Sequence, residues 1–270
     1  MDHQKMKEFF KGTFNAIATG YDNPAMRFFS ESADRVSSYL DLKGNEHVLD
    51  VATGTGAVAL AIAGDLPEGH VTGIDFSKGM LSQAIRKKEA AGICNASFVE
   101  MDMQEIDFPD NYFDAAVNSF GLFFMEDMER QLAHIADKVK PGGKVLMSTF
   151  YDNSFTPLVD LFRDRLVAYG VQPPSLAWKR VATEEQCIDF FQDSGLGRVS
   201  CDRVSCGYFL DSPLGWWDIV WNGGFRGLVN QVSPDRFEQF KTDHLFEVEQ
   251  RATDQGIWLE MGVLYTLGVK

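Results

Sequence analysis

Short apolar runs alternate with amphipathic stretches through the first half of the chain. Runs of about four to eight apolar residues, bounded by turn residues, predict strands that are buried on both faces. These runs lie at 47–51, 70–75, 96–100, 113–120 and 143–150. Helical spacing of apolar residues is found between them, at 57–64, 77–91 and 126–139. This alternation predicts a parallel sheet with helices on both faces.

The two flanks of the chain have a different pattern. Residues 5–40 have helical spacing, with a break at Asn23-Pro24. After Phe150 the chain turns to longer helical stretches, and a capping-box pattern starts at Thr183. Further helices are predicted at 154–170, 183–195 and 233–252, and further strands at 198–206 and 257–268.

No repeat, low-complexity segment or flexible linker divides the 270 residues. We therefore expect a single domain, 1–270. It would consist of an N-terminal helical segment (1–44), a ligand-binding core (45–150), and a C-terminal region (151–270) with the last strands and helical insertions that form an acceptor pocket.

Composition and charge narrow the possible partners. The net charge of −14 argues against nucleic acid, which requires clustered Lys and Arg. No apolar run approaches the roughly 20 residues of a membrane helix, and the polar N-terminus shows no signal peptide. We expect a cytoplasmic protein that binds small molecules and does not insert into a membrane.

The four cysteines show no zinc-ligand spacing, so no metal site is expected. The pair Cys201 and Cys206 could hold a soft metalloid such as arsenite. The alternative is that these cysteines are small buried hydrophobic residues.

A glycine-rich turn followed by an acid gives the first indication of a ligand. Val48–Gly56 reads VLDVATGTG, an apolar strand leading into Gly54 and Gly56, and Asp75 closes the next apolar run. Glycines let the backbone turn sharply close to a ligand, and the acid can accept hydrogen bonds from two ribose hydroxyls. The string from Gly54 to Ala59 also matches G-x-G-x-x-A, so a nicotinamide or flavin dinucleotide is one candidate.

Further acids favour a different nucleoside. Asp50 lies inside the first strand, where a negatively charged pyrophosphate would be disfavoured and a cationic amino group with a sulfonium would be accepted. Asp102 and Met103 follow the third strand, where a carboxylate can address an adenine amino group. Anchoring of the glycine loop is an equal alternative for Asp50, and Met103 could be an ordinary core residue.

Taken in order, these motifs resemble the class I S-adenosylmethionine-dependent methyltransferases. The set comprises Val48–Gly56, Asp75, Asp102, Phe113–Phe120 and Lys140–Gly143. The stretches 109–122 and 14–22 are especially similar to the ubiquinone/menaquinone-biosynthesis C-methyltransferase group. The resemblance implies an α/β, Rossmann-like doubly wound and mostly parallel seven-stranded sheet, with N-terminal helices and helical insertions near the C-terminus.

The resemblance also implies roles for individual residues. Gly54 and Gly56, with Ala52 and Thr53, would face the methionine part of S-adenosyl-L-methionine. Asp75 would hold the ribose, while the adenine would be contacted by Phe76, Met80, Asp102 and Met103. Asn118 and Ser119 would lie beside the sulfonium, and Tyr21 would close over the cofactor.

The implied function is methyl transfer to a small apolar or aromatic acceptor, at carbon, oxygen or nitrogen. A protein that binds the cofactor without catalysis is the alternative, followed by an NAD-dependent oxidoreductase. No clear base is present. Tyr21 and His244 are candidates, although a solvated helix face is favoured for His244. Trp216, Trp217 and Phe225 would line the acceptor pocket or form the core of their own segment.

Overall fold

The computed structural model describes residues 3–270, which divide into two compact units. The sheet unit comprises Phe28–Asp152, Ala177–Val204 and Val263–Lys270. The helical unit comprises Met1–Arg27, Asn153–Leu176 and Ser205–Gly262. Each unit is therefore assembled from three separate stretches of chain, and the single domain expected over 1–270 stays a prediction.

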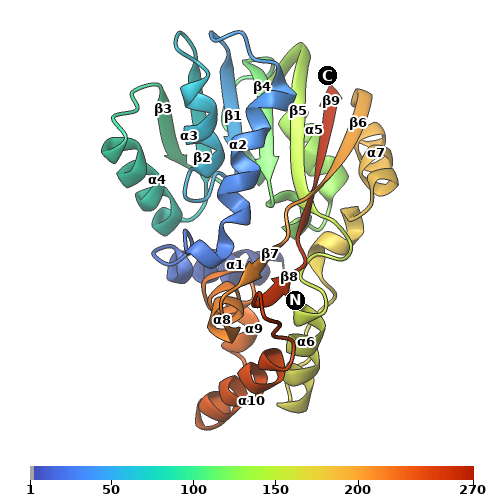
Figure 1. Cartoon of the computed structure of the whole chain (residues 1–270). Coiled ribbons are helices and arrows are strands. Elements are labelled where there is room, and N and C mark those ends of the chain that lie inside the picture. Colours follow the sequence, from blue (N-terminus) through green and yellow to red (C-terminus); the bar gives the residue numbers. More distant parts are fainter. Residues whose placement is uncertain (1–2) are drawn as a thin grey trace. The chain divides into compact units, whose positions relative to one another are not determined.

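The sheet unit is built on seven strands in the order β3-β2-β1-β4-β5-β9-β6 (Figure 1). Their bounds are β1 His47–Val51, β2 His70–Asp75, β3 Ala96–Glu100, β4 Phe113–Ser119, β5 Val139–Phe150, β6 Gly197–Ser205 and β9 Gly262–Val269. Strands β3, β2, β1, β4 and β5 pair in parallel, and β9 runs antiparallel to β5. The predicted mostly parallel, seven-stranded sheet is confirmed.

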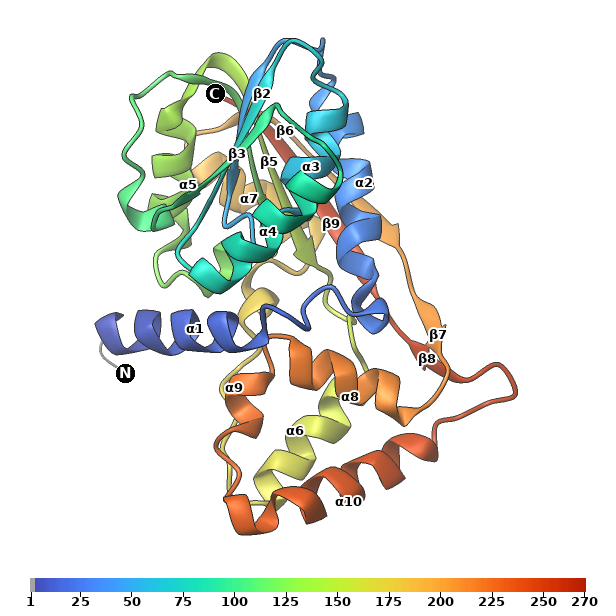
Figure 2. The same cartoon turned by 90° about the vertical axis from the view of Figure 1, so that its left-hand side faces the viewer.

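Helices cover both faces of this sheet. Figure 2 shows α2 and α3 on one side of the strands and α5 and α7 on the other. The helices of the sheet unit are α2 Phe28–Leu40, α3 Ala57–Gly64, α4 Lys78–Ala90, α5 Met128–Lys138 and α7 Glu184–Asp193, with 3-10 turns η2 Met103–Glu105, η3 Leu122–Phe124 and η4 Ala177–Val181. Ser77 caps α4, and Thr183 forms the predicted capping box at α7.

The helical unit has its own aromatic core. Its elements are α1 His3–Ile17, η1 Pro24–Met26, α6 Leu158–Ala168, β7 Tyr208–Leu210, α8 Pro213–Asn222, α9 Arg226–Val229, η5 Pro234–Arg236, α10 Phe237–Glu249 and β8 Ile257–Leu259. Phe225 lies with its ring centroid 5.8 Å from Phe155 and 5.6 Å from Phe162, and Trp217 stacks on Trp221 at 5.9 Å. These rings pack on one another, which supports the core alternative; lining of an acceptor pocket stays a prediction.

Two of the predicted strands differ from the structure by more than one residue at a boundary. Strand β5 begins at Val139 instead of 143, because Pro141 cannot continue a helix and the register shift between Phe113 and Ala115 takes up the extra residues. The single strand expected at 257–268 is two strands, since β8 pairs with β7 while β9 pairs with β5. Within residues 3–270, no helix has the length and apolar character needed to cross a membrane.

Candidate functional site

The predicted ligand residues of the core come together at one edge of the sheet. Parallel strands place their carboxyl ends at the same edge, and ligands of α/β sheets bind where the strand order reverses. Here β1 lies between β2 and β4, so the chain leaves β1 and β4 in different directions. Gly54 and Asp102 follow β1 and β3, while Asp75 is the last residue of β2 and Asn118 lies one residue before the end of β4.

The buried carboxylate of Asp50 is hydrogen-bonded to the glycine loop. Its side chain is 1% exposed, and its Oδ2 accepts hydrogen bonds from Thr53 Oγ1 at 2.6 Å and from the backbone N–H of Ala59 at 3.1 Å. The carboxylate thereby joins the loop to the first turn of α3. This geometry supports the anchoring role for Asp50, and a direct contact with a cofactor stays a prediction.

Asp75 connects the second strand to the same loop. Its Oδ2 accepts from Gly54 N at 2.9 Å, and its Oδ1 accepts from Ser77 N at 2.8 Å. The loop also continues the β1–β2 pairing, since Thr53 N donates to Ile74 O at 2.9 Å. The ends of β1 and β2 therefore form one connected structure around the Asp75 carboxylate, which is 7% exposed.

Both buried acids resist ionisation. Burial raises the pKa of Asp50 to about 7 and that of Asp75 to about 6. Hydrogen bonds from Thr53 and Ala59 oppose the rise in the pKa of Asp50, and those from Ser77, Gly54 and Phe76 oppose it at Asp75. A cationic ligand beside these carboxyls would favour their charged forms, whereas a phosphate would disfavour them.

The segment after β3 lies against the end of β2. Met101 N donates to Asp75 O at 3.1 Å, and Asp102 then caps η2 by accepting from Gln104 N at 2.9 Å. Asp102 and Met103 therefore directly follow a residue that is hydrogen-bonded to Asp75. Phe76 is half-buried, while Met80 is only 1% exposed inside α4, which fits a core residue. Contact of any of these four residues with adenine stays a prediction.

Asn118 ties the ends of β1 and β4 together. Its Nδ2 donates to Val51 O at 2.9 Å, and its Oδ1 accepts from Leu122 N at 2.8 Å and from Gly121 N at 3.3 Å. This residue was predicted to lie beside the sulfonium, and its amide is directed to the two neighbouring backbones. Ser119 Oγ lies 3.1 Å from Ser148 Oγ on β5.

The two loops that Asn118 joins are strained. Ala52 has φ 57 and Phe120 has φ 56, a left-handed conformation that costs a residue with a side chain about 1–3 kcal/mol. A Cβ on Gly121 would lie 2.9 Å from both Ala52 Cβ and Asn118 Nδ2. The strained residues therefore meet at a contact that only glycine allows, next to the predicted methyl-transfer position.

An aromatic cluster of the sheet unit was missed by the sequence analysis. Phe120, at the end of β4, lies 4.5 Å from Phe150 at the end of β5, and Phe29 and Trp178 complete the group at 5.1 Å from Phe120 and 5.5 Å from Phe150. These residues come from α2, β4, β5 and η4, so no local pattern shows that they meet. Only the position of Phe120 and Phe150 at strand ends could have indicated it.

The two candidate bases lie in the helical unit. Tyr21 follows α1 and is half-buried; its predicted closure over the cofactor stays a prediction. The solvated helix face that the sequence favoured for His244 is wrong. Its side chain is 0% exposed and lies among Phe162, Phe240 and Trp216. Its Nε2 accepts from Trp216 Nε1 at 2.8 Å, and burial lowers its pKa to about 4.

The arsenite-type alternative is wrong for Cys201. This residue is on β6, which lies beyond β4, β5 and β9 from the glycine loop after β1. Four strand spacings correspond to about 19 Å, too far for its sulfur to reach a sulfonium at that loop. Within residues 3–270 no group of three or more His, Cys, Asp or Glu side chains is arranged to hold a metal ion.

The strand-end site fits a nucleoside with a cationic tail. The backbone N–H groups of Gly54, Ser77 and Phe76 bond to the Asp75 carboxylate, whose two oxygens offer about four acceptor positions, so capacity for a ribose hydroxyl is left. A Cβ at Gly54 would meet nothing within 4 Å, so the backbone there faces open space. The fold and this site are those expected of a Rossmann-like, S-adenosylmethionine-dependent methyltransferase.

Comparison with known proteins supports this class. Residues 48–143 match the model of the methyltransferase domain family, so this part of the chain is a methyltransferase domain. A solved structure of an S-adenosylmethionine-dependent methyltransferase from Aquifex aeolicus superimposes with a TM-score of 0.54 at 21% identity, covering 68% of this chain and 90% of that one. The predicted fold is confirmed, and the match over residues 48–143 supports the predicted class.

Curated relatives align over part of their length. The ubiquinone/menaquinone biosynthesis C-methyltransferase UbiE of Bdellovibrio bacteriovorus is 31% identical over 153 residues, which are 55% of this chain and 65% of that protein. The aklanonic acid methyltransferase DauC of a Streptomyces species is 28% identical over 169 residues, or 59% of this chain and 77% of that protein. The chain thus spans less than two thirds of the UbiE relative.

Proposed function

We propose that this protein transfers the methyl group of S-adenosylmethionine to a small, apolar, ring-bearing acceptor. The observation that carries the proposal is the connected site at the ends of β1 and β2, where the Asp75 carboxylate holds the Gly54 amide and keeps acceptor capacity for a ribose. The names of the relatives, which refer to quinone biosynthesis and to aklanonic acid, support a ring-bearing acceptor.

The protein's contribution would be positioning. S-adenosylmethionine supplies an activated methyl group, so the protein must align the acceptor atom and exclude water. Alignment of this kind can lower a barrier by about 7–11 kcal/mol. The rigid connection of β1 to β4 through Asn118, and the aromatic cluster around Phe120 and Phe150, are suited to hold one geometry at the strand ends.

The acceptor itself would supply the nucleophile. Among the described residues of the sheet unit, His47 and His70 begin their strands at the opposite edge, and His134 Nε2 accepts the Ile106 N–H at 3.2 Å on α5. None of these histidines lies at the carboxyl ends of the strands. An acidic phenol or enol, or an amine, needs no strong protein base, and such an acceptor fits the site best.

Calorimetry and a labelled-methyl assay test the proposal in sequence. We expect S-adenosylmethionine to bind the wild type, and Asp75→Asn to weaken that binding. Labelled methyl should then be transferred to members of a panel of short-chain dihydroquinones and aromatic polyketide acids. Absence of cofactor binding would refute the proposal. Binding with no transfer to any panel member would instead support the silent cofactor-binding alternative.

A further inference from the structure

Two cysteine thiols face each other in the sheet unit, away from the cofactor site. Cys187 lies on α7 and is 0% exposed, whereas Cys201 lies on β6 and is half-buried. Thr266 Oγ1 donates to Cys201 Sγ at 3.4 Å, and the two thiols are close enough for each to shift the pKa of the other. They are separated by the α7–β6 connection in sequence, and the proposed methyl transfer uses neither of them.

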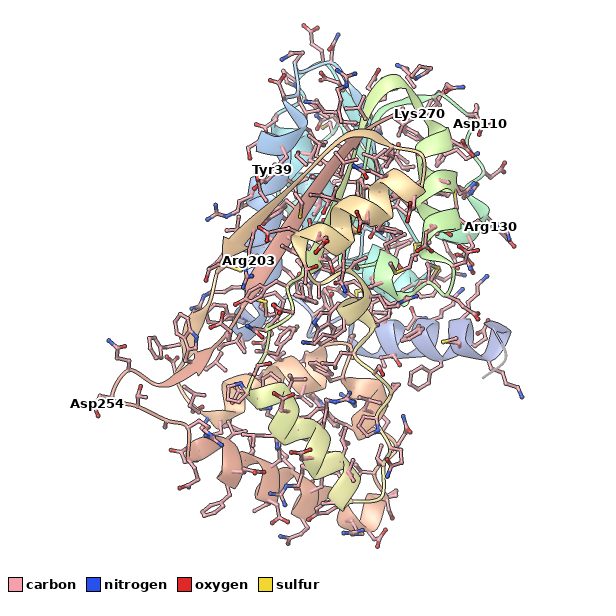
Figure 3. All side chains as sticks on the ribbon, turned by 90° about the vertical axis from the view of Figure 1, so that its right-hand side faces the viewer. Tyr39, Asp110, Arg130, Arg203, Asp254 and Lys270 are labelled. Atoms are coloured by element: carbon pink, nitrogen blue, oxygen red, sulfur yellow. The ribbon has the colours of Figure 1, made fainter. Side chains whose placement is uncertain are left out.

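The packing of α7 on the sheet explains why the thiols meet. Phe191 of α7 lies over Gly268 of β9, where a Cβ would come within 2.9 Å of the phenyl ring. Cys187 is one helical turn before Phe191, and Thr266 is two residues before Gly268, so both point into the same interface. Strand β6 is the neighbour of β9 and brings Cys201 to that interface. Figure 3 shows this edge, with Arg203 marking β6.

Thr266 and Cys187 both favour an ionised Cys201. Thr266 Oγ1 donates to Cys201 Sγ at 3.4 Å, and the Cys187 thiol hydrogen has two acceptors in reach, Val181 O at 3.4 Å and the sulfur of Cys201. The interaction with Cys187 holds the pKa of Cys201 below its usual range, against the effects of burial and of Glu184 and Asp202. The same interaction raises the pKa of Cys187.

We propose that Cys187 and Cys201 form an oxidisable dithiol that hydrogen peroxide converts to an intramolecular disulfide. The Cys201 thiolate attacks one peroxide oxygen, the O–O bond breaks, and the sulfur is oxidised to sulfenic acid while hydroxide leaves. Cys187 then attacks the Cys201 sulfur. The S–S bond forms, the S–O bond breaks, and hydroxide leaves with the proton of Cys187 as water. In total, two thiols and one peroxide give one disulfide and two waters.

The order of the two steps follows from exposure. Reactive cysteines combine thiolate character with solvent access, and Cys201 has both because it is half-buried on β6, the last strand of the sheet. Cys187 is fully buried and its thiol is the weaker acid of the two, so peroxide cannot reach it first. Its position against the Cys201 sulfur is the one a resolving thiol needs.

Mass spectrometry of a Cys94→Ser, Cys206→Ser background tests the proposal, since only the two thiols of interest remain. After treatment with hydrogen peroxide, the intact protein should lose two hydrogen atoms, and a peptide cross-linked between Cys187 and Cys201 should appear. Dithiothreitol should restore the original mass. Failure to form the cross-link, or oxidation of Cys201 to sulfinic acid without a disulfide, would overturn the proposal.

Two further variants in this background separate the roles. In Cys187→Ser, oxidation should stop at a Cys201 sulfenic acid that dimedone traps. Thr266→Val should slow the loss of free thiol severalfold, because Cys201 loses a hydrogen-bond donor while the side-chain shape at 266 is kept. Circular dichroism checks that both variants are folded. An unchanged rate in folded Thr266→Val, or dimedone trapping on Cys187 in a Cys201→Ser variant, would contradict the assigned order.

Discussion

Replacement of Asn118 by alanine tests whether the strand-end site depends on its connection between β1 and β4. The substitution removes hydrogen bonds to Val51 O, Leu122 N and Gly121 N, all of which are buried. A buried backbone group left without a partner costs about 1–3 kcal/mol. The two shorter bonds, at 2.9 and 2.8 Å, therefore predict a loss of about 2–6 kcal/mol in the free energy of unfolding of the sheet unit.

Cofactor binding should weaken in the same variant. Asn118 holds the loops that contain Ala52 and Phe120, whose left-handed conformations are costly and would relax once released. Binding would then have to restore the left-handed conformations of the two loops. If this costs about 1.4 kcal/mol, the affinity for S-adenosylmethionine falls tenfold.

Urea denaturation and calorimetry measure the two effects, and Ser119→Ala is the matched control. Ser119 is adjacent in sequence and makes a single half-buried hydrogen bond to Ser148, so its loss should cost less than about 1 kcal/mol. The reasoning is refuted if Asn118→Ala has the urea midpoint and the cofactor affinity of the wild type, or if both variants lose the same stability.

Three further changes test other parts of the structure. Asp75→Asn should weaken S-adenosylmethionine binding at least about tenfold by calorimetry, because its amide places a donor against the N–H of Gly54 or Ser77; unchanged affinity would exclude Asp75 from the site. Gly56→Val should fail to fold at 37 °C, judged by circular dichroism, since its φ of 80 is strained for valine and a Cβ would lie 2.9 Å from Ala84; a wild-type melting curve would contradict this. His244 is buried with a pKa lowered to about 4, against about 6.5 when unfolded, so the unfolded chain binds the extra proton and stability should fall by up to about 3 kcal/mol as the pH drops from 6.5 to 4. This fall should be smaller in folded His244→Gln, and an equal fall would assign it to other groups.

The strands of the predicted cofactor-binding core could be predicted because short stretches of sequence are enough to define them. Strands β1, β2 and β3 have the predicted bounds, since each is a short apolar run closed by turn residues. The contact between Asp75 and the Gly54 loop follows from the parallel order of β1 and β2. The residue types in the sequence and the strand order of the sheet therefore both place Asp75 next to the Gly54 loop.

The remainder of the site depends on register, which the sequence alone does not reveal. Asn118 contacts Val51 because these residues are paired between β4 and β1, and Ser119 meets Ser148 because they are paired between β4 and β5. The left-handed φ of Phe120 has no sequence marker, since glycine is the residue that normally indicates it. Strand β7 was missed because three residues that pair only with the distant β8 carry too little pattern.

The electrostatics of the glycine loop favour one of the two nucleosides that the sequence left open. Burial raises the pKa of both Asp50 and Asp75, so keeping both carboxylates charged costs free energy when no ligand is bound. A ligand with an ammonium and a sulfonium offsets that cost, whereas a pyrophosphate adds like charge at the same loop. The glycine turn and an acid at Asp75 are common to both ligand types, and we expect Asp50 to favour S-adenosylmethionine over a pyrophosphate-bearing ligand.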